Sequence, residues 1–307
     1  GSSMRPPDRD GLGASAVELP PGPWPTVLDF LIAQFPSVTR ADWLQRMVDG
    51  RVVDEAGAEL APEAPYQPHG RVFYFRSVAD ETRIPFDETI LFQDDLLVVA
   101  DKPHFLPVAP AGRYVQETLL VRLKRKLRIE TLAPMHRIDR DTAGLVLFSV
   151  QPDTRDAYQR LFRERAVAKI YEAIAPWRAD IAWPVTVRNR LVESDAFMQM
   201  REVEGVANAE TQISVLETNG PYARYLLQPL TGQKHQLRAH MAGLGVPIVN
   251  DRIYPVLYAA NAEAEADDFR APLQLLAKAI AFRDPVTGQP RRYESARTLS
   301  EWPTSAH

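Results

Sequence analysis

The chain has 307 residues, of which 45% are hydrophobic, and its formal net charge is −4. It is long enough to bury one large core or two smaller ones. No apolar run approaches the roughly 20 residues that a membrane-spanning helix needs. The absence of cysteine excludes disulfides, thiolate nucleophiles and cysteine-based zinc sites, and agrees with a cytoplasmic location. No secretory signal is recognisable, and residues 1–3 indicate a tag remnant before Met4.

The N-terminal part predicts an arm followed by a small domain. Residues 1–23 are rich in proline and lack hydrophobic periodicity, so we expect a tag and a disordered arm. The small domain should span 24–77 and contain two short helices, the second capped by Thr39. A hairpin around Gly57 and a closing strand at 72–75 should follow.

Two short helices followed by strands resemble the small RNA-binding module that was first described in a ribosomal protein and is often fused to RNA-modifying enzymes. The basic first helix usual in that module is replaced here by Asp29, Phe30 and Gln34. A purely structural cap therefore stays an open alternative. The polar stretch 78–86 is expected to be a linker, and 87–303 a second, larger domain.

A strongly basic segment, 122–128, follows the first strands of the larger domain. It holds five basic residues in seven, and on a helix Arg122, Arg125 and Lys126 would lie opposite an apolar face formed by three leucines. Such a face is either an ordinary solvated surface or a surface that follows RNA phosphates.

The segment 136–144 reads His-Arg-Ile-Asp-Arg-Asp-Thr-Ala-Gly and leads directly into an apolar strand. Asp139 stands between Arg137 and Arg140, and neighbouring positive charges favour an ionised carboxylate. Such a carboxylate is an oxygen nucleophile at neutral pH. The alternative is a solvated turn whose charges pair with one another. Its position before a buried strand favours chemistry, because rigid scaffolds present functional loops in this way.

Two later segments carry further candidates. In the alternating strand 167–174, Lys169 and Tyr171 point to the same face. A helix is expected to open at Thr231 and to place Arg238 at the border of its apolar stripe, where a paired, partly buried arginine fits as well as one that reaches out to solvent.

Other chemistries lack support in the sequence. His235 and His240 diverge by about 140° on a helix and cannot share one ion, so no metal site is predicted. Neither a phosphate-cradling glycine loop nor a serine-hydrolase elbow is present. Asp139 and Asp141 could form a glycosidase pair, but the flanking arginines would lower both pKa values when one should be raised.

Four segments in order resemble the RluA-type pseudouridine synthases. Residues 136–144 resemble the family signature, and 90–103 its opening strand pair with an Asn/Asp-Lys-Pro ending. Residues 169–173 are similar to its Lys-x-Tyr-x-Ala strand. Residues 231–251 are similar to its Thr-Gly-Arg-x-His-Gln-Ile-Arg-x-His segment.

The resemblance implies an isomerase that detaches uracil from ribose, rotates it and rejoins it through carbon 5, without a cofactor or metal. Asp139 would be the essential carboxylate, attacking the ribose or the base or assisting elimination. Tyr171 would stack on the displaced uracil and help to remove the carbon-5 proton, and Arg238 would hold Asp139 ionised. Arg137 would fill the gap left by the flipped nucleotide. The side chains expected to contact RNA are Arg122, Arg125, Lys126, Arg137, Arg140 and Lys169.

The implied fold is α+β, with a mixed, mainly antiparallel sheet, flanking helices and a central cleft. Ribosomal or transfer RNA is the expected partner, with no membrane and no nucleotide cofactor. The sequence departs from the family at Ala143, Gln233 and Leu276, where serine, arginine and histidine are common. The main alternative is a catalytically inactive RNA-binding or ribosome-assembly factor with the same fold, and a glycoside hydrolase is a more distant one.

Overall fold

The computed structural model describes residues 6–7, 14–36, 38–75, 83–110, 114–194, 199–255 and 269–303. The chain divides into two compact units. One comprises Gly1–Glu81 with Ala109–Glu130, and the other Thr82–Val108 with Thr131–His307. The domain boundaries predicted from the sequence stay a proposal. They assign 109–130 to the larger domain, whereas this segment clusters with the small unit.

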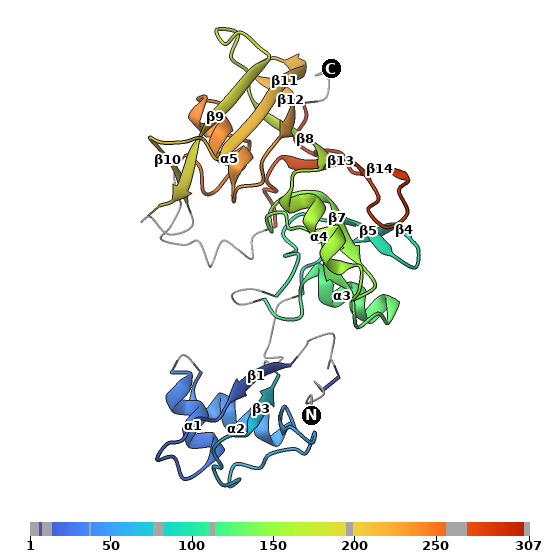
Figure 1. Cartoon of the computed structure of the whole chain (residues 1–307). Helices are drawn as coiled ribbons and strands as arrows, with labels where there is room; N and C mark the ends of the chain where they lie inside the picture. Colours follow the sequence, from blue (N-terminus) through green and yellow to red (C-terminus); the bar gives the residue numbers. More distant parts are fainter. Residues whose placement is uncertain are drawn as a thin grey trace. The chain divides into compact units, whose positions relative to one another are not determined.

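The small unit contains a three-stranded antiparallel sheet in the order β1-β3-β2 and the helices α1 and α2 (Figure 1). Thr26 and Thr39 cap the two helices by accepting hydrogen bonds from the backbone N–H groups three residues on, as expected for N-cap threonines. The elements are β1 Ser15–Glu18, α1 Val27–Gln34, α2 Arg40–Val48, β2 Val52–Asp54 and β3 Arg71–Tyr74; α3, Leu119–Leu127, belongs to the same unit.

Strand β1 corrects the prediction of a disordered arm up to residue 23. Ser15 to Glu18 pair with β3 in antiparallel register, from Ser15 opposite Tyr74 to Glu18 opposite Arg71. The prolines around this short strand hid it, although the adjoining Leu19 is buried in the core of the unit. The rest of the predicted arm at 1–5 and 8–13 and the linker residues 78–82 lie outside the described residues.

The larger unit is built on a mixed sheet that has 11 strands among the residues described. Its main path runs β10-β9-β11-β12-β8-β13-β7-β5-β4, and β13 with β7 is a parallel pair in an otherwise antiparallel arrangement. The predicted α+β fold with a mainly antiparallel sheet is confirmed. The strands are β4 Thr89–Gln93, β5 Leu97–Lys102, β6 Ala133–Pro134, β7 Ala143–Ser149, β8 Val167–Pro176, β9 Val185–Glu193, β10 Met200–Val203, β11 Ala209–Asn219, β12 Tyr222–Pro229, β13 Leu275–Arg283 and β14 Pro290–Glu294.

Two apolar clusters hold this unit together. One joins β8, β11 and β12 to helix α5, Gln236–Gly243, and includes Tyr225 and Met241. The other joins β5, β7 and β13 to helix α4, Arg155–Arg163, through Tyr158. The Tyr158 hydroxyl lies 3.0 Å from both carboxylate oxygens of the buried Asp284, which satisfies its polar group. No helix in the described part of the chain is long and apolar enough to span a membrane.

Helix α5 begins later than predicted. We expected it to open at Thr231, but its first residue is Gln236. The Gln236 side-chain oxygen accepts hydrogen bonds from the Thr231 hydroxyl at 2.5 Å and from Gln233 N–H at 3.1 Å, and His235 is left-handed with φ 55°. These side-chain bonds hold 231–235 in a turn, because they offer the backbone an alternative to the helix.

A row of paired residues crosses four strands at the place where the predicted site residues lie. Lys102 on β5 pairs with Gly144 on β7, Gly144 pairs with Ala277 on β13, and Ala277 pairs with Tyr171 on β8. Gly144 has φ 118°, and an added Cβ would lie 2.2 Å from the Ala277 carbonyl oxygen. Only glycine fits there. The sheet therefore fixes the end of the Asp139 loop beside Lys102 and Tyr171.

Candidate functional site

Asp139 lies in the loop between β6 and β7, where Thr142 N–H donates to its carbonyl oxygen at 3.1 Å. Its carboxylate is 27% exposed, so a ligand can reach it. Oδ2 lies 3.4 Å from Nη1 of Arg238, which comes from α5 and is only 2% exposed. The structure thus pairs the two residues that the sequence suggested as partners.

Arg238 has a second and closer partner, Asp251. Nε donates to Oδ2 at 3.0 Å and Nη2 to Oδ1 at 2.7 Å, and the Asp251 side chain is 1% exposed. Burial alone would lower the pKa of Arg238, but the hydrogen bonds and charge of Asp251, followed by the charge of Asp139, raise it above its ordinary value. The guanidinium therefore stays charged and its orientation is fixed.

Tyr171 reaches the same place from the middle of the sheet. It is half-buried on β8 and packs against the cluster that contains α5. Burial raises the pKa of its hydroxyl, and the negative charge of Asp139 raises it further. The hydroxyl is therefore protonated at neutral pH, and Asp139 is close enough to act on it electrostatically. Asp139, Tyr171 and Arg238 are brought together, although they lie far apart in sequence.

Lys102 and His104 hold the backbone that follows Asp139. The buried Lys102 Nζ donates to the carbonyl oxygen of Arg140 at 2.8 Å, and His104 Nδ1 lies 2.8 Å from the carbonyl oxygen of Asp141. Burial lowers the pKa of Lys102 to about 7, although the charges of Asp141 and Asp139 act in the opposite direction. Lys102 is the last residue of β5 and His104 follows it two residues later. The end of this strand therefore supplies two side chains that hold the loop carrying Asp139.

The two arginines next to Asp139 in the sequence have different surroundings. Arg140 forms an ion pair with Asp141 at 2.9 Å. Arg137 is exposed and forms no ion pair with any residue that the structure describes. Burial opposes ionisation of Asp141, but the charges of Arg140, Arg238 and Lys102 outweigh it and lower its pKa. Asp141 is therefore unsuited to be the protonated acid of a glycosidase pair.

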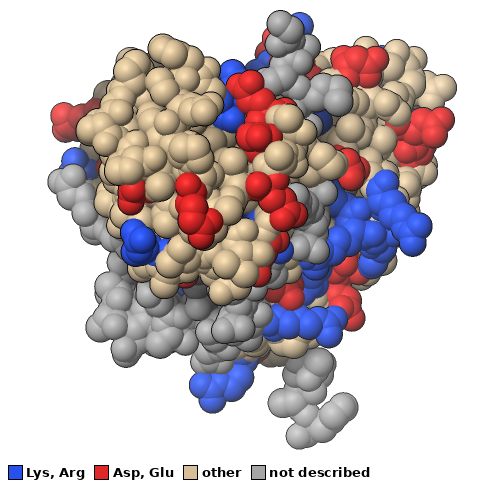
Figure 2. All heavy atoms as spheres, turned by 90° about the horizontal axis from the view of Figure 1, so that it is seen from below, with Lys and Arg blue, Asp and Glu red and all other residues tan. Residues whose placement is uncertain are grey.

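The remaining predicted RNA contacts differ in accessibility. Lys169 is half-buried, and burial lowers its pKa; its Nζ would lie 3.6 Å from a Cβ added at Gly232. On α3, Arg125 and Lys126 are exposed, but the Arg122 side chain is only 13% exposed and pairs with Glu117 at 2.8 Å. The prediction that all three point to solvent is wrong for Arg122. On the face drawn in Figure 2, several Lys and Arg side chains lie next to one another despite the negative net charge.

Three polar residues around Asp139 were given no part in the predicted site: Asp251, His235 and Tyr254. His235 Nε2 lies 3.9 Å from Asp139 Oδ1, and its Nδ1 lies 3.1 Å from the Tyr254 hydroxyl. Asp251 and His235 lie within the segment 231–251, so their motif was the available signal. Tyr254 follows the motif and could be found only from the folded chain.

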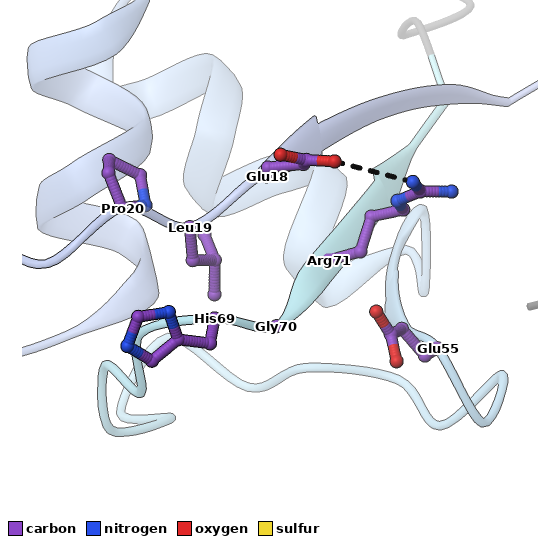
Figure 3. A pocket seen from close by; sticks show the side chains of 7 residues that line it. All are labelled: Glu18, Leu19, Pro20, Glu55, His69, Gly70 and Arg71. Carbon is purple, nitrogen blue, oxygen red and sulfur yellow. Dashed lines mark hydrogen bonds and ion pairs between the residues drawn. The ribbon is translucent and has the colours of Figure 1, made fainter.

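A pocket of about 590 Å³ lies within the small unit, lined by 18–20, Glu55 and 69–71 (Figure 3). Glu18 and Arg71 form an exposed ion pair across it at 3.4 Å. It contains none of the predicted site residues, and its mixed charges do not favour a particular ligand. Among the residues that the structure describes, no group of three or more His, Asp or Glu side chains could hold a metal ion.

Comparison with known proteins identifies the family to which this chain is similar. The family described as RNA pseudouridylate synthase matches residues 96–243, which include Asp139, Tyr171 and Arg238. The dual-specificity RNA pseudouridine synthase RluA of Pasteurella multocida is 30% identical, over 64% of this chain and 88% of that protein. An uncharacterised RNA pseudouridine synthase of Synechocystis sp. is 29% identical, over 74% of this chain and 79% of that protein.

Some longer relatives match a smaller share of this chain. The mitochondrial tRNA pseudouridine(32) synthase of Saccharomyces cerevisiae is 32% identical over 54% of this chain, and the match covers 36% of the yeast protein. Among solved structures, human RNA pseudouridylate synthase domain containing 4 superposes with a TM-score of 0.52 and 29% identity. That match covers 69% of this chain and 88% of the human chain.

Proposed function

This chain belongs to the RluA-type RNA pseudouridine synthases, and from that premise we propose that it converts specific uridines of ribosomal or transfer RNA to pseudouridine, with Asp139 as the essential carboxylate. The observation that carries the proposal is the contact between Asp139 and Arg238 at 3.4 Å, beside Tyr171. A carboxylate, a fixed cation and an aromatic hydroxyl meet at one accessible point.

The reaction breaks the bond between uracil N1 and ribose C1′, turns the base and forms a bond between C5 and C1′, while the C5 proton leaves and N1 gains one. Atoms and electrons balance within the nucleotide, so no cofactor is required. Asp139 attacks the ribose or the base, or assists elimination. Tyr171 stacks on the displaced base and helps to remove the C5 proton. Arg238 pairs with the Asp139 carboxylate and holds it in place.

The target base must leave the RNA stack to meet these groups, because a stacked base is out of reach. Arg137 is exposed two residues before Asp139 and is suited to occupy the vacated space. Arg140, Lys169, Arg125 and Lys126 contribute positive charge toward the RNA backbone. A cytoplasmic location and a role in rRNA or tRNA processing complete the proposal. They are supported by the cysteine-free composition and by the named substrate of the yeast relative.

RNA labelled with tritium at uridine C5 tests the activity, because forming the C5–C1′ bond releases the label. We expect release from cellular ribosomal or transfer RNA with the wild-type chain and none with Asp139→Asn. The control Asp153→Asn changes an exposed carboxylate near the start of α4 and should retain activity. Full activity of Asp139→Asn would refute the mechanism. Binding of RNA without release of tritium from any cellular RNA would favour the inactive binding or assembly factor.

A further inference from the structure

The two carboxylate oxygens of Asp139 face two different residues, one in the turn that precedes α5 and one in α5 itself. Oδ2 faces the guanidinium of Arg238 at 3.4 Å, and Oδ1 faces Nε2 of His235 at 3.9 Å. The His235 side chain is 9% exposed, so little water competes for this contact. The distance to His235 is longer than a hydrogen bond, but contacts of this kind often tighten when a substrate binds.

The tautomer of His235 follows from its other neighbour. Met200 N–H donates to the Tyr254 hydroxyl oxygen at 2.7 Å, and this oxygen lies 3.1 Å from His235 Nδ1. If the hydroxyl donates its own hydrogen to Nδ1, the neutral imidazole carries its hydrogen on Nε2. The opposite tautomer would direct the Nε2 lone pair at the Asp139 carboxylate, which is electrostatically unfavourable.

The charge state of the ring agrees with this assignment. Burial lowers the pKa of His235, whereas the charge of Asp139 acts in the opposite direction. The other charged groups that act on the ring are Arg238, Lys234 and Asp251. At neutral pH the ring is therefore neutral, and the choice between its two tautomers is the relevant one.

Asp251 fixes the position of Tyr254 as well as that of Arg238. Its Oδ1 accepts a hydrogen bond from Tyr254 N–H at 3.1 Å, in addition to the one from Arg238 Nη2. The Tyr254 ring meets the His235 ring edge-on, with 5.6 Å between ring centroids, and Arg238 Cζ lies 5.9 Å from the Tyr254 centroid. One buried carboxylate thus holds Arg238 directly and also holds Tyr254, the residue whose hydroxyl lies beside His235.

We propose that His235 is a positioning residue for Asp139: its Nε2–H, in the tautomer set by the Tyr254 hydroxyl, orients the carboxylate through Oδ1 while Arg238 holds Oδ2. This role rests on the proposed function, because a fixed carboxylate matters only if Asp139 reacts. A reacting group held in one orientation speeds the chemical step, and misplacement by about 1 Å can cost roughly 100-fold in rate.

The tautomer can be measured without any RNA. In protein labelled with ¹⁵N-histidine, the ring nitrogens of His235, identified by their loss in His235→Gln, should show hydrogen on Nε2 near pH 7.5. Tyr254→Phe removes the hydroxyl donor and should shift the ring toward a mixture of tautomers. Hydrogen on Nδ1 in the wild type, or an unchanged tautomer in Tyr254→Phe, would overturn the proposal.

The kinetic arm compares two amides at position 235. The glutamine amide extends to the region of Nε2 and the asparagine amide only to that of Nδ1, so His235→Gln should retain most of kcat. His235→Asn should lose roughly 10- to 100-fold in kcat with little change in KM. The control His240→Gln changes a buried histidine on α5, the helix that His235 precedes, and this histidine contacts Thr211 and Asn189. It should retain kcat per folded molecule.

Each result has a separate meaning. Equal kcat values for His235→Asn, His235→Gln and wild type would overturn the positioning role and leave the proposed function intact. If His235→Gln and His235→Asn lost activity equally, the Nε2–H would not be the relevant group, and the proposal would also fall. If the wild-type chain released no tritium from any RNA, the proposed function would fail, and the ¹⁵N measurement would still decide whether Tyr254 sets the tautomer.

Discussion

Arg238 and Asp251 form a bidentate ion pair, with contacts of 2.7 and 3.0 Å and with no more than 2% of either side chain exposed. By comparison, the contact of Arg238 with Asp139 is a single one at 3.4 Å. The guanidinium is therefore oriented by Asp251 and presents its remaining N–H group to Asp139. Asp251, for which the sequence predicted no role, thus orients Arg238, for which it predicted one.

Asp251→Asn should impair both folding and activity. The change leaves the buried Arg238 charge without its main partner, and breaking a buried pair in this way costs about 3–5 kcal/mol. Urea unfolding should show this loss, and tritium release per folded molecule should fall at least about 100-fold. Asp180→Asn breaks an exposed ion pair with Arg178 and should leave the free energy of unfolding almost unchanged. Similar effects of the two variants would contradict the role of Asp251.

Lys102→Met should slow catalysis without preventing folding. It removes the hydrogen bond to the Arg140 carbonyl oxygen, so the loop that carries Asp139 loses one of its two side-chain anchors. We expect kcat to fall about tenfold, a change in barrier of about 1.4 kcal/mol. Lys278→Met is the matched control, because Lys278 also donates to two carbonyl oxygens but contacts β14 and the segment after it. If both variants lost kcat equally, the anchoring role of Lys102 would be refuted.

Gly144→Ala should disrupt the sheet. An alanine Cβ would lie 2.2 Å from the Ala277 carbonyl oxygen, so β7 and β13 would have to separate. Gly220→Ala is the control: it also has a positive φ, 60°, but nothing lies within 4 Å of the added Cβ. We expect Gly220→Ala to lose about 1 kcal/mol from the left-handed backbone alone and Gly144→Ala to lose several times more. If the two variants lowered the melting temperature equally, the strands would be able to move apart at Ala277 at little cost in free energy.

His136 should make the protein sensitive to acid. Leu147 N–H donates to its Nε2 at 3.1 Å, which requires the neutral ring, and burial lowers its pKa to about 3. The unfolded chain, with an ordinary histidine pKa of about 6.5, binds the proton first. Stability contributed by the neutral ring is therefore complete above about pH 6.5 and decreases as the pH falls toward 3.

Between these limits one proton contributes a slope of about 1.4 kcal/mol per pH unit. Urea unfolding of the wild type at several values between pH 7 and 4 should show it, together with the contributions of His104 and His240, whose pKa values burial lowers to about 4. His136→Gln should have a correspondingly smaller slope. A variant with the wild-type slope would show that His136 accepts its proton in the folded state.

Helix α3 should contribute to RNA affinity through Arg125 and Lys126. Replacing both exposed residues with glutamate should weaken RNA binding. The slope of log affinity against log salt concentration should also fall, by an amount that corresponds to the loss of up to about two phosphate contacts. Arg122→Glu should affect the salt dependence less and stability more, because Arg122 is tied to Glu117. Filter binding at several salt concentrations would measure this. Unchanged affinity of the double variant would make α3 an ordinary solvated helix.

Local features of the fold were predictable from the sequence, and distances between distant segments were not. The cap at Thr39 and the hairpin around Gly57 depend on a few neighbouring residues, and both are present. The start of α5 was wrong because the Gln236 side chain stabilises the preceding turn.

The residues at the centre of the site were predictable from the sequence, but the residues that hold them in position were not. The resemblance selected Asp139, Tyr171 and Arg238, and the structure brings these three together. Nothing in the sequence showed that Lys102, 38 residues before Arg140, binds its carbonyl oxygen. Strands β9 and β10 were not predicted either.

The cross-strand row from Lys102 through Gly144 and Ala277 to Tyr171 sets the gap between the reacting groups by backbone pairing, about 4.8 Å per strand. Apolar residues under the sheet can then be exchanged over evolution without altering that gap. Insertion or loss of one residue in β7 or β13 would instead turn every following side chain to the opposite face. The enzyme can therefore tolerate many substitutions among its apolar core residues, but hardly any change in the lengths of β7 and β13.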